Sequence, residues 1–444
     1  MKKSIWSISF AFMFAIILLS GCASASTPVP PTISPTETSI PPTQTPNPSD
    51  TPAPTATPTE LPLFIPGANN LILTMVLQPD GKIVVGGVFT KMNGETRNYI
   101  ARLNPDRTLD SSFNPEANGP VHALALQSDG KIVVGGAFKT LGGEPRRYIA
   151  RLNPDGTLDT SFNPGAAFID VGTDNRVFTL AVQADGKIIV GGHFYSVDGA
   201  LHKNFITRLN SDGSFDTAFN PVPIGSVFAL VLQADGKIIL GGSFTKLNEK
   251  AHFQIARLNP DGTLDASFDS GISYEHGQND FVFALALQPD NKILVGGSFA
   301  KLGSAILRLN PDGTRDNSFS PQMDGSAFAI AIQADGKILL GGDFTTVNGE
   351  PHNQLAQLNS DGTLDALFNP KLSGVIGVLR VKFQSGPISI VASFGKDGAV
   401  WAIAPQPNGT IVVGGGFTEL SGEARNSIAG LNPDGTLEEA IPIP

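Results

Sequence analysis

The chain has 444 residues, a formal charge of −10 and a single cysteine, Cys22. This length exceeds the roughly 250 to 300 residues that one compact core organises, so a repetitive architecture or several units are expected. The acidic charge makes nucleic acid a poor partner, because phosphates require clustered lysine and arginine side chains. A single cysteine also excludes a disulfide within the chain.

The first 21 residues have the layout of a secretory signal. Lys2 and Lys3 precede an apolar run, residues 8–19, that is too short for an ordinary membrane-spanning helix. The next residues resemble the bacterial lipobox: Leu19, Ser20, Gly21 and Cys22. That resemblance implies cleavage before Cys22 and acylation of its thiol and its new amine. The expected product is an extracytoplasmic protein, lipid-anchored to a bacterial membrane or cell surface.

Residues 22–61 are rich in serine, threonine and proline and almost free of apolar side chains. Such a segment cannot bury a core, so it is predicted to stay extended as a tether. In polyproline II geometry, at about 3.1 Å per residue, its reach is on the order of 100 Å. The remaining residues, 62–444, are predicted to form the folded domain.

One sequence unit recurs seven times in this domain, and each copy contains a Gly-Gly pair. Copy two, residues 121–164, reads as four short strands, with Asp-Gly turns at Asp129 and Asp155 that supply the positive φ angles of tight hairpins. Both faces of the inner strands are apolar, as blades stacked on two neighbours require. The fold class is therefore predicted to be all-β, a seven-bladed β-propeller of four-stranded antiparallel blades. The pairs begin at Gly86, Gly135, Gly191, Gly241, Gly296, Gly341 and Gly414.

The copies depart from regularity at several places. Arg107 and Asn291 replace turn glycines, and Gln357 and Gly430 replace an arginine that recurs in the third strand. These blades are expected to be less regular. The last two Gly-Gly pairs are farther apart than the usual spacing of about 50 residues, but the extra length is shorter than a blade. This predicts an inserted hairpin at about 371–398 and no eighth blade. Residues 59–67 resemble an orphan fourth strand that could close the ring, and the competing candidate is residues 437–441 of copy seven.

The repeated segments LQPDGKIVVGG and IARLNPDGTLDxSFNP resemble the delta-60 repeat of bacterial cell-surface and secreted β-propellers. The resemblance covers nearly everything from Leu71 to Leu437. It implies the fold and no agreed ligand or reaction. The recurring third-strand arginines and fourth-strand aspartates, such as Arg151 and Asp159, are interpreted as a repeated structural ion pair.

Functional residues are expected among positions that are not repeated. The loops between strands two and three share one face of the ring with the connections between blades, so this variable face is the predicted recognition surface. A candidate ligand rim comprises His193, Ser243, Ser298, Asp343, Arg146, Arg147 and His202. Residues one or more blades apart cannot form a catalytic triad at about 3 Å, and the histidines lack metal-ligand spacing, so no catalytic residue, metal or cofactor is predicted.

The sequence therefore favours a cell-envelope lipoprotein that presents a propeller as a non-catalytic binding or scaffold module. The expected partners are the membrane, through the lipid anchor, and a glycan or envelope protein on the variable face. Two alternatives stay open. One is an extracytoplasmic polysaccharide hydrolase or lyase that draws an acid or base from the variable loops, and the other is a subunit of an envelope assembly.

Overall fold

The computed structural model describes residues 67–167, 175–194, 205–271, 280–299, 304–374, 379–385, 388–394 and 398–438. The predicted signal peptide, Cys22, the tether and His202 lie outside these residues. The chain divides into two units at Thr59, and all described residues belong to the second. Within the described ranges, no helix has the length and apolarity needed to span a bilayer.

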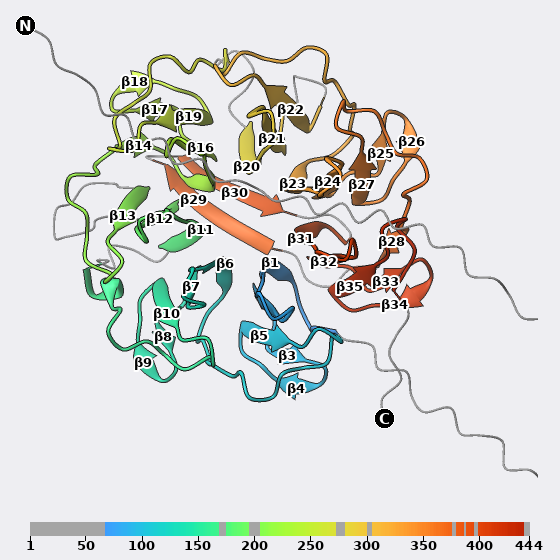
Figure 1. Cartoon of the computed structure of the whole chain (residues 1–444), viewed down its shortest axis with the longest axis horizontal. Helices are drawn as coiled ribbons and strands as arrows, with labels where there is room; N and C mark the ends of the chain where they lie inside the picture. Colours follow the sequence, from blue (N-terminus) through green and yellow to red (C-terminus); the bar gives the residue numbers. More distant parts are fainter. Residues whose placement is uncertain are drawn as a thin grey trace, which may run out of the picture. The chain divides into compact units, whose positions relative to one another are not determined.

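Seven antiparallel sheets, built from the repeated strands, surround a common axis (Figure 1). The first strands lie nearest the axis and contact one another around the whole ring, including β1 against β31. They are β1 (Ile72–Leu77), β6 (Val121–Leu126), β11 (Arg176–Val182), β15 (Val227–Leu232), β20 (Phe281–Leu287), β23 (Ala327–Ile332) and β31 (Val400–Pro405). The second strands are β2 (Ile83–Gly87), β7 (Ile132–Gly136), β12 (Ile188–His193), β16 (Ile238–Gly242), β21 (Ile293–Ser298), β24 (Ile338–Gly342) and β32 (Ile411–Gly415). The third are β5 (Ile100–Leu103), β10 (Ile149–Leu152), β13 (Ile206–Leu209), β19 (Ile255–Leu258), β22 (Ile306–Leu309), β27 (Leu355–Leu358) and β35 (Ile428–Leu431).

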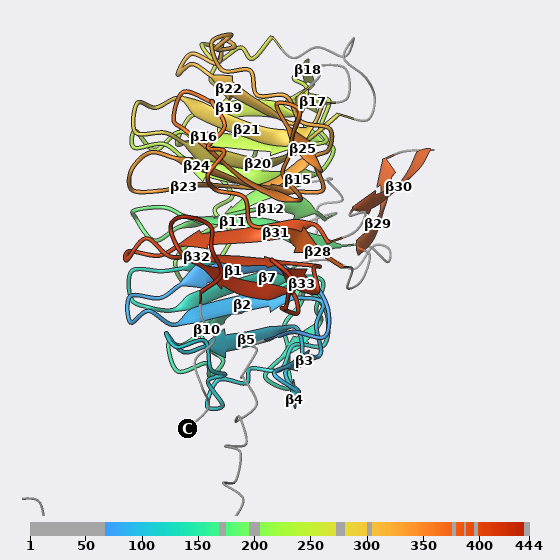
Figure 2. The same cartoon turned by 90° about the vertical axis from the view of Figure 1, so that its right-hand side faces the viewer.

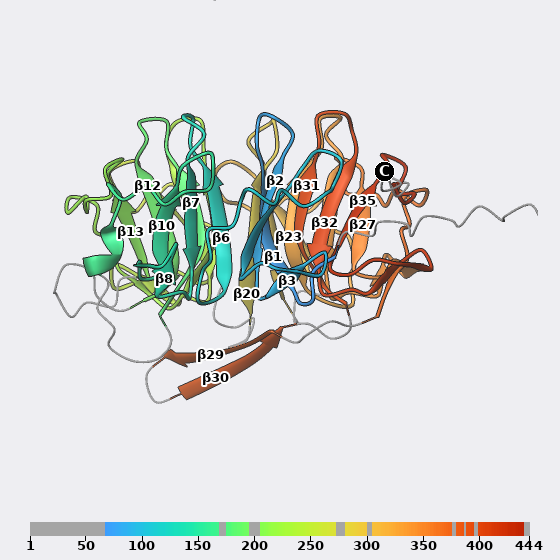
Figure 3. The same cartoon turned by 90° about the horizontal axis from the view of Figure 1, so that it is seen from below.

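Short outer strands lie at the variable face, most of them in the loops between the second and third strands and two in the connections between blades (Figures 2 and 3). They form small sheets of their own, separate from the blade sheets. Their bounds are β3 (Lys91–Met92), β4 (Glu95–Thr96), β8 (Thr140–Leu141), β9 (Glu144–Pro145), β14 (Pro223–Ile224), β17 (Lys246–Leu247), β18 (Lys250–Ala251), β25 (Thr346–Val347), β26 (Glu350–Pro351), β28 (Leu372–Ser373), β33 (Glu419–Leu420) and β34 (Glu423–Ala424). A short 3-10 helix, η1 (Pro164–Ala167), follows copy two.

The fourth segment of each copy pairs more briefly than a full strand. In copy two it makes one bridge, Leu152 to Leu158, and then turns. Asp159 causes the turn, because its side chain accepts the backbone N–H of Ser161 and its carbonyl accepts that of Phe162. The segment thereby leaves its own blade and delivers Phe162 to the core of the next one.

The Gly-Gly pairs are explained by close packing on both sides of strand two. A Cβ on Gly135 would lie 2.5 Å from Cγ1 of Val177 in the next blade. A Cβ on Gly136 would lie 2.1 Å from the carbonyl oxygen of Pro120, which directly precedes the first strand of the same blade. Only glycine leaves room for both neighbours.

The predicted arginine–aspartate ion pair is confirmed. The Nε of Arg151 donates to Oδ2 of Asp159 at 2.8 Å, and both side chains are buried. The guanidinium also lies 4.4 Å from the ring centroid of Phe162 and donates to the carbonyl oxygen of Ser211 in the following blade at 2.6 Å. One arginine thus ties its own blade to the next.

This network also fixes the charge of the aspartate. Burial opposes ionisation of Asp159, but hydrogen bonds from Ser161, Lys131 and Arg151 outweigh it and hold the pKa of this carboxyl well below its usual range. Equivalent pairs hold four further blades: Arg102–Asp110, Arg208–Asp216, Arg257–Asp265 and Arg308–Asp316.

The atypical copies were expected to form less regular blades, but their strand pairing is as regular as in the others. The strand pairs that contain Arg102, Arg308, Gln357 and Gly430 all keep the same register. Asn291 adopts the left-handed conformation that the turn requires, with φ of 64°, and asparagine tolerates it better than most residues. In blade six, Gln357 accepts a hydrogen bond from Nζ of Lys337 at 3.2 Å.

Within the predicted insertion, β29 (Leu379–Ser385) and β30 (Ile388–Phe394) form an antiparallel hairpin. Among the described strands they pair only with each other. The ends of the insertion meet, since a Cβ on Gly398 would lie 2.7 Å from the carbonyl oxygen of Gly374. The chain therefore leaves and re-enters the ring at one point.

Candidate functional site

His193 of the predicted rim is buried at the end of β12. Its Nδ1 lies 2.8 Å from Oγ of Ser226, at the entry to the next blade. Oγ of Ser243 in turn accepts the backbone N–H of Ser226 at 3.2 Å. His193 and Ser243 therefore meet at one residue, Ser226, and stabilise the boundary between blades three and four.

The other rim positions are distributed around the ring. Asp343 accepts the backbone N–H of Ser326 at 2.6 Å, a role parallel to that of Ser243. Ser298 pairs with Phe281 at the end of β21. Arg146 is buried and donates to the carbonyl oxygen of Pro145, whereas Arg147 is exposed. These side chains do not converge on one point, and two of them, Ser243 and Asp343, bond to the backbone at the entry to a first strand.

A different feature does converge on the axis, and it begins with a β-bulge. In every first strand, the register against the second strand shifts at the same place, opposite the Gly-Gly pair. A bulge leaves one residue unpaired and changes the direction of its side chain. The seven unpaired residues are Leu73, His122, Phe178, Phe228, Phe283, Phe328 and Trp401.

Six of these seven residues carry rings, and their rings touch in sequence around the axis. We call the seven bulge residues the collar. The centroid distance is 5.4 Å for His122 to Phe178, 5.4 Å for Phe178 to Phe228 and 5.8 Å for Phe228 to Phe283. It is 5.4 Å for Phe283 to Phe328 and 4.2 Å for the stacked pair of Phe328 and Trp401. All but Phe328 stay partly accessible, so the collar presents an aromatic surface inside the ring.

His122 is the polar member of the collar. Burial, with a smaller contribution from the positive charge of Arg176, lowers the pKa of His122 to about 3. The imidazole is therefore neutral at physiological pH. Its Nε2 is buried and has no hydrogen-bond partner among the described residues.

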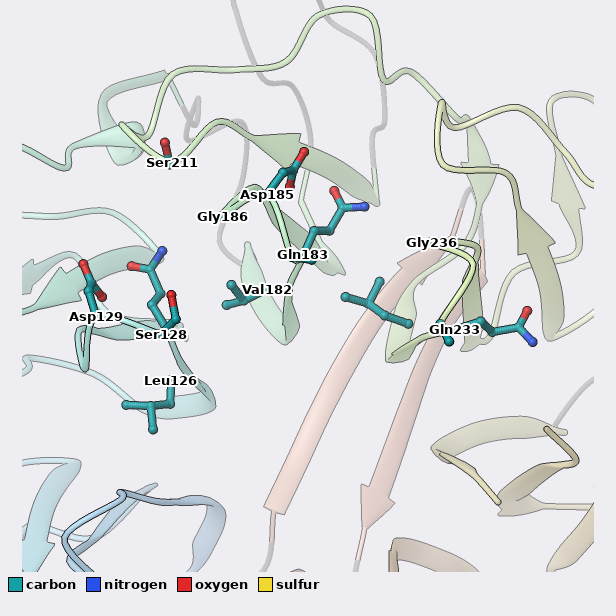
Figure 4. A pocket seen from close by; sticks show the side chains of 14 residues that line it. Leu126, Ser128, Asp129, Val182, Gln183, Asp185, Gly186, Ser211, Gln233 and Gly236 are labelled. Carbon is teal, nitrogen blue, oxygen red and sulfur yellow. The ribbon is translucent and has the colours of Figure 1, made fainter. Parts of the chain in front are cut away.

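A pocket of about 810 Å³ lies at the opposite end of three of the same strands (Figure 4). Leu126, Val182 and Leu232, the last residues of β6, β11 and β15, contribute its apolar surface. Gln183 and Asp185 stand at its polar edge. Val182 lies four positions after the collar residue Phe178, which corresponds to about 13 Å along a strand.

The edge of this pocket is acidic. The turns between the first and second strands of blades two and three carry Asp129 and Asp185 at this edge, while the lysine of each turn points away from it. Lys131 follows Asp129 in such a turn, yet its Nζ bonds Asp159 in the outer part of the blade at 3.0 Å. The turn aspartates accept the backbone N–H two residues later. Their positions are Asp80, Asp129, Asp185, Asp235, Asp290 and Asp335, with Asn408 in blade seven.

The collar was not predicted from the sequence. Its residue types differ from blade to blade, and each lies within an apolar run in which one ring-bearing residue does not stand out. The sequence carries one signal for it, which is positional: the residue that follows a valine or alanine near the start of each of these runs carries a ring in six copies. Among the described residues, no three His, Cys, Asp or Glu side chains are grouped to hold a metal ion.

The seven sheets, closed around an axis with a collar of bulge residues, define a seven-bladed β-propeller. A family described as a domain of unknown function, DUF5122 beta-propeller, matches residues 78–113, 127–162, 183–219, 233–268, 288–319, 333–368 and 406–439. The chain belongs to this family. Comparison with curated proteins found no match.

Several solved structures are similar to this chain at low sequence identity. The extracellular domain of a putative one-component system from B. thetaiotaomicron is 15% identical, with a TM-score of 0.45, over 82% of this chain and 40% of that one. The chain thus spans well under two thirds of that domain. Virginiamycin B lyase from Staphylococcus aureus is 14% identical over 82% and 96%, with a TM-score of 0.44. The WD40 propeller of Doa1 is 14% identical over 81% and 95%, with a TM-score of 0.45. Likenesses at this level concern the fold alone.

Proposed function

We propose that this protein is a lipoprotein of a bacterial cell envelope whose propeller is a non-catalytic binding module, with the ligand site at the collar. The observation that carries the proposal is the contact series from His122 to Trp401. Six ring-bearing side chains from six blades meet there near the variable face, and all of them except Phe328 are partly accessible. Such a surface suits binding, because aromatic side chains offer large contact areas.

Binding is favoured over catalysis by the state of the candidate reactive groups. His193 is hydrogen-bonded to Ser226, and Asp343 holds the backbone of Ser326. His193 is within the distance that a base and a nucleophile need, but the side chains of His193 and Ser226 are both buried, which keeps a substrate away from them. The alternative, a polysaccharide hydrolase or lyase, remains an outcome of the binding test.

The anchor rests on the lipobox, which lies outside the described residues. Cleavage before Cys22 would leave Ala23 and Ser24 next to the lipid. We expect Cys22→Ala to abolish labelling by radioactive palmitate in the bacterial host and to leave an unprocessed precursor. A matched variant, Ser24→Ala, keeps the cysteine and should be labelled normally. Acyl label that persists in Cys22→Ala would contradict the anchor.

The binding function is tested with the soluble chain from Ala23 onward, which lacks the leader and the lipidated cysteine. The immobilised protein is exposed to an array of envelope glycans and to detergent and solvent extracts of the host envelope. Retention of a defined compound, reduced by Phe228→Leu, supports the proposal. Chemical turnover of a retained polysaccharide would favour the enzyme, and retention of nothing would contradict a binding module.

A further inference from the structure

We infer that the pocket at the ends of β6, β11 and β15 is a second binding site, and that it takes a cationic amphiphile, a small molecule that joins a positive charge to an apolar chain. The inference goes beyond the proposed function. The pocket lies at the opposite end of these strands from the collar, so a ligand at one site does not contact the other.

The pocket has the size and the apolar surface of a small-molecule site. Its volume is about 810 Å³, and small-molecule sites typically enclose roughly 300–1,000 Å³. Leu126, Val182 and Leu232 line it, and all three side chains are partly accessible. An apolar chain in the pocket would remove their exposed surface from water, which favours binding.

Small residues at the turns explain why the pocket lies in this part of the ring. The residue before each turn aspartate is small in the three consecutive copies that border the pocket, namely Ser128, Ala184 and Ala234. Copy six also has an alanine here, but it stands between two copies with proline. Serine and alanine leave more room beside the strand ends than proline does. The prolines of copies one, five and seven are Pro79, Pro289 and Pro407.

The charge at the edge of the pocket selects a cation. Asp129 and Asp185 are exposed and line this edge (Figure 4). Among the described residues that line the pocket there is no lysine, arginine or histidine. A positively charged group on the ligand therefore meets carboxylates without a competing cation in the lining, and an anionic group would be repelled.

The nearest basic side chains of the protein are already paired. Lys187 belongs to the same turn as Asp185, but its Nζ bonds Asp216 at 2.9 Å. Arg151 donates to the carbonyl oxygen of Ser211, which lines the pocket, but its guanidinium is buried and paired with Asp159. The carboxylates at the edge thus keep their charge available for a ligand.

Three probes separate the charge from the apolar chain. Hexyltrimethylammonium carries both, tetramethylammonium carries only the charge, and hexanoate carries the chain with the opposite charge. Isothermal titration calorimetry measures their binding to the chain from Ala23 onward, which contains every described residue. We expect hexyltrimethylammonium to bind saturably, about tenfold more tightly than either other probe, because only it uses both parts of the pocket. Added sodium chloride should weaken this binding, since salt screens the charges.

A pair of matched variants locates the site. Asp185→Asn removes a carboxylate but keeps the turn, because Asn408 of blade seven accepts the same backbone N–H two residues later. Affinity for hexyltrimethylammonium should fall about fivefold. The control is Asp335→Asn in blade six. Its turn has the same hydrogen bond and a lysine paired in the same way, but Asp335 is not among the residues that line the pocket. This variant should bind as the parent does, and melting temperatures establish that both are folded.

The outcomes separate this site from the proposed function. Equal losses in Asp185→Asn and Asp335→Asn would overturn the inference, because they would show attraction to the acidic surface as a whole. Binding that does not saturate, or hexanoate binding as tightly as hexyltrimethylammonium, would also overturn it. Phe228→Leu alters the collar alone and should leave the affinity for hexyltrimethylammonium unchanged. The collar is tested by the glycan array and envelope extracts, so either proposal can fail without the other.

Discussion

Arg107 of blade one forms an ion pair with Glu438 of blade seven, at 3.2 Å between Nη2 and Oε2, and so joins the two ends of the ring. Glu438 occupies the position of the aspartate that recurs in the fourth segment of the other copies. Its backbone N–H donates to the carbonyl oxygen of Gly430, just as the backbone N–H of Asp110 donates to the carbonyl oxygen of Arg102. Arg107 also donates to the carbonyl oxygen of Pro105.

At the interface between blades seven and one, the arginine of the repeated network therefore comes from blade one. In blade one, Arg102 donates to Pro154, the counterpart of Pro105 in the following blade. Blade seven has Gly430 at the position of this arginine. Arg107, from the neighbouring blade one, donates instead to the two corresponding acceptors, the carbonyl oxygen of Pro105 and the carboxylate of Glu438. The two departures from the repeat compensate each other.

The first prediction concerns this exchange. Arg107→Asn removes the charge but tolerates the positive φ of 69° at this turn, as Asn291 does in blade five. We expect a loss of about 1 kcal/mol in the free energy of unfolding, because Glu438 loses its partner. Urea titration gives the value. The double variant Arg107→Gly with Gly430→Arg restores the usual arrangement and should recover parental stability. A double variant less stable than Arg107→Asn would refute the exchange.

The second prediction concerns ring closure by the N-terminal segment. Ala68 donates to the carbonyl oxygen of Asn426 at 2.9 Å and bridges Met92, so this segment connects blade seven to blade one. The preceding residues 61–66 lie outside the described ranges. In copy seven, Leu437 makes the bridge to Leu431 that the fourth segment makes in other copies, so up to Glu438 the competing segment occupies this position. If residues 61–66 complete the rest of blade seven, a chain that begins at Gly67 should melt at a lower temperature than one that begins at Thr59. Removal of residues 439–444 is the matched control for the competing segment, and unchanged melting of the Gly67 chain would exclude N-terminal closure.

The third prediction distinguishes the two glycines of a pair. Gly136→Ala places a methyl group against the carbonyl oxygen of Pro120, which belongs to the backbone and cannot rotate away. Gly135→Ala meets a side chain, Val177, that can shift. We expect losses of about 3 and about 1 kcal/mol in unfolding free energy, respectively. Gly143→Asn, at an open turn with φ of 78°, should change little. Equal losses at the first two positions would contradict the packing argument.

The fourth prediction follows from the lowered pKa of His122. The folded value of about 3 lies below the unfolded value of about 6.5, so the unfolded chain binds the proton more readily in this window. Stability should therefore fall as pH decreases from 6.5 towards 3, by up to about 1.4 kcal/mol per pH unit from this residue. His122→Phe should lose less stability between pH 6.5 and pH 4.5, measured by urea unfolding. Parallel curves for the two proteins would contradict a buried, neutral imidazole.

The aspartates affect a lower pH range. The pKa of Asp159 is held below its usual value in the folded state, so its contribution to stability is complete above about pH 4 and is lost as the pH falls further. The His122 effect can thus be read above pH 4.5 without interference from this carboxylate.

The sequence by itself determined the parts of this protein that repeat. Seven copies of a strand-and-turn pattern predicted the propeller, since stacked blades bury faces that one blade alone would leave exposed. The covalent spacing of Arg151 and Asp159 on adjacent segments was enough to predict their ion pair. Such features depend on local order within one copy, and the same local order recurs in the others.

Only the tertiary structure decided how different copies meet. The collar arises because one bulge in each blade brings residues such as His122 and Phe178 from separate copies to one level of the axis. Arg107 and Glu438 lie 331 residues apart, and their pairing requires the ring to be closed. Contacts of this kind depend on blade rotation and register. These are properties of the closed ring, and no single copy of the repeat encodes them.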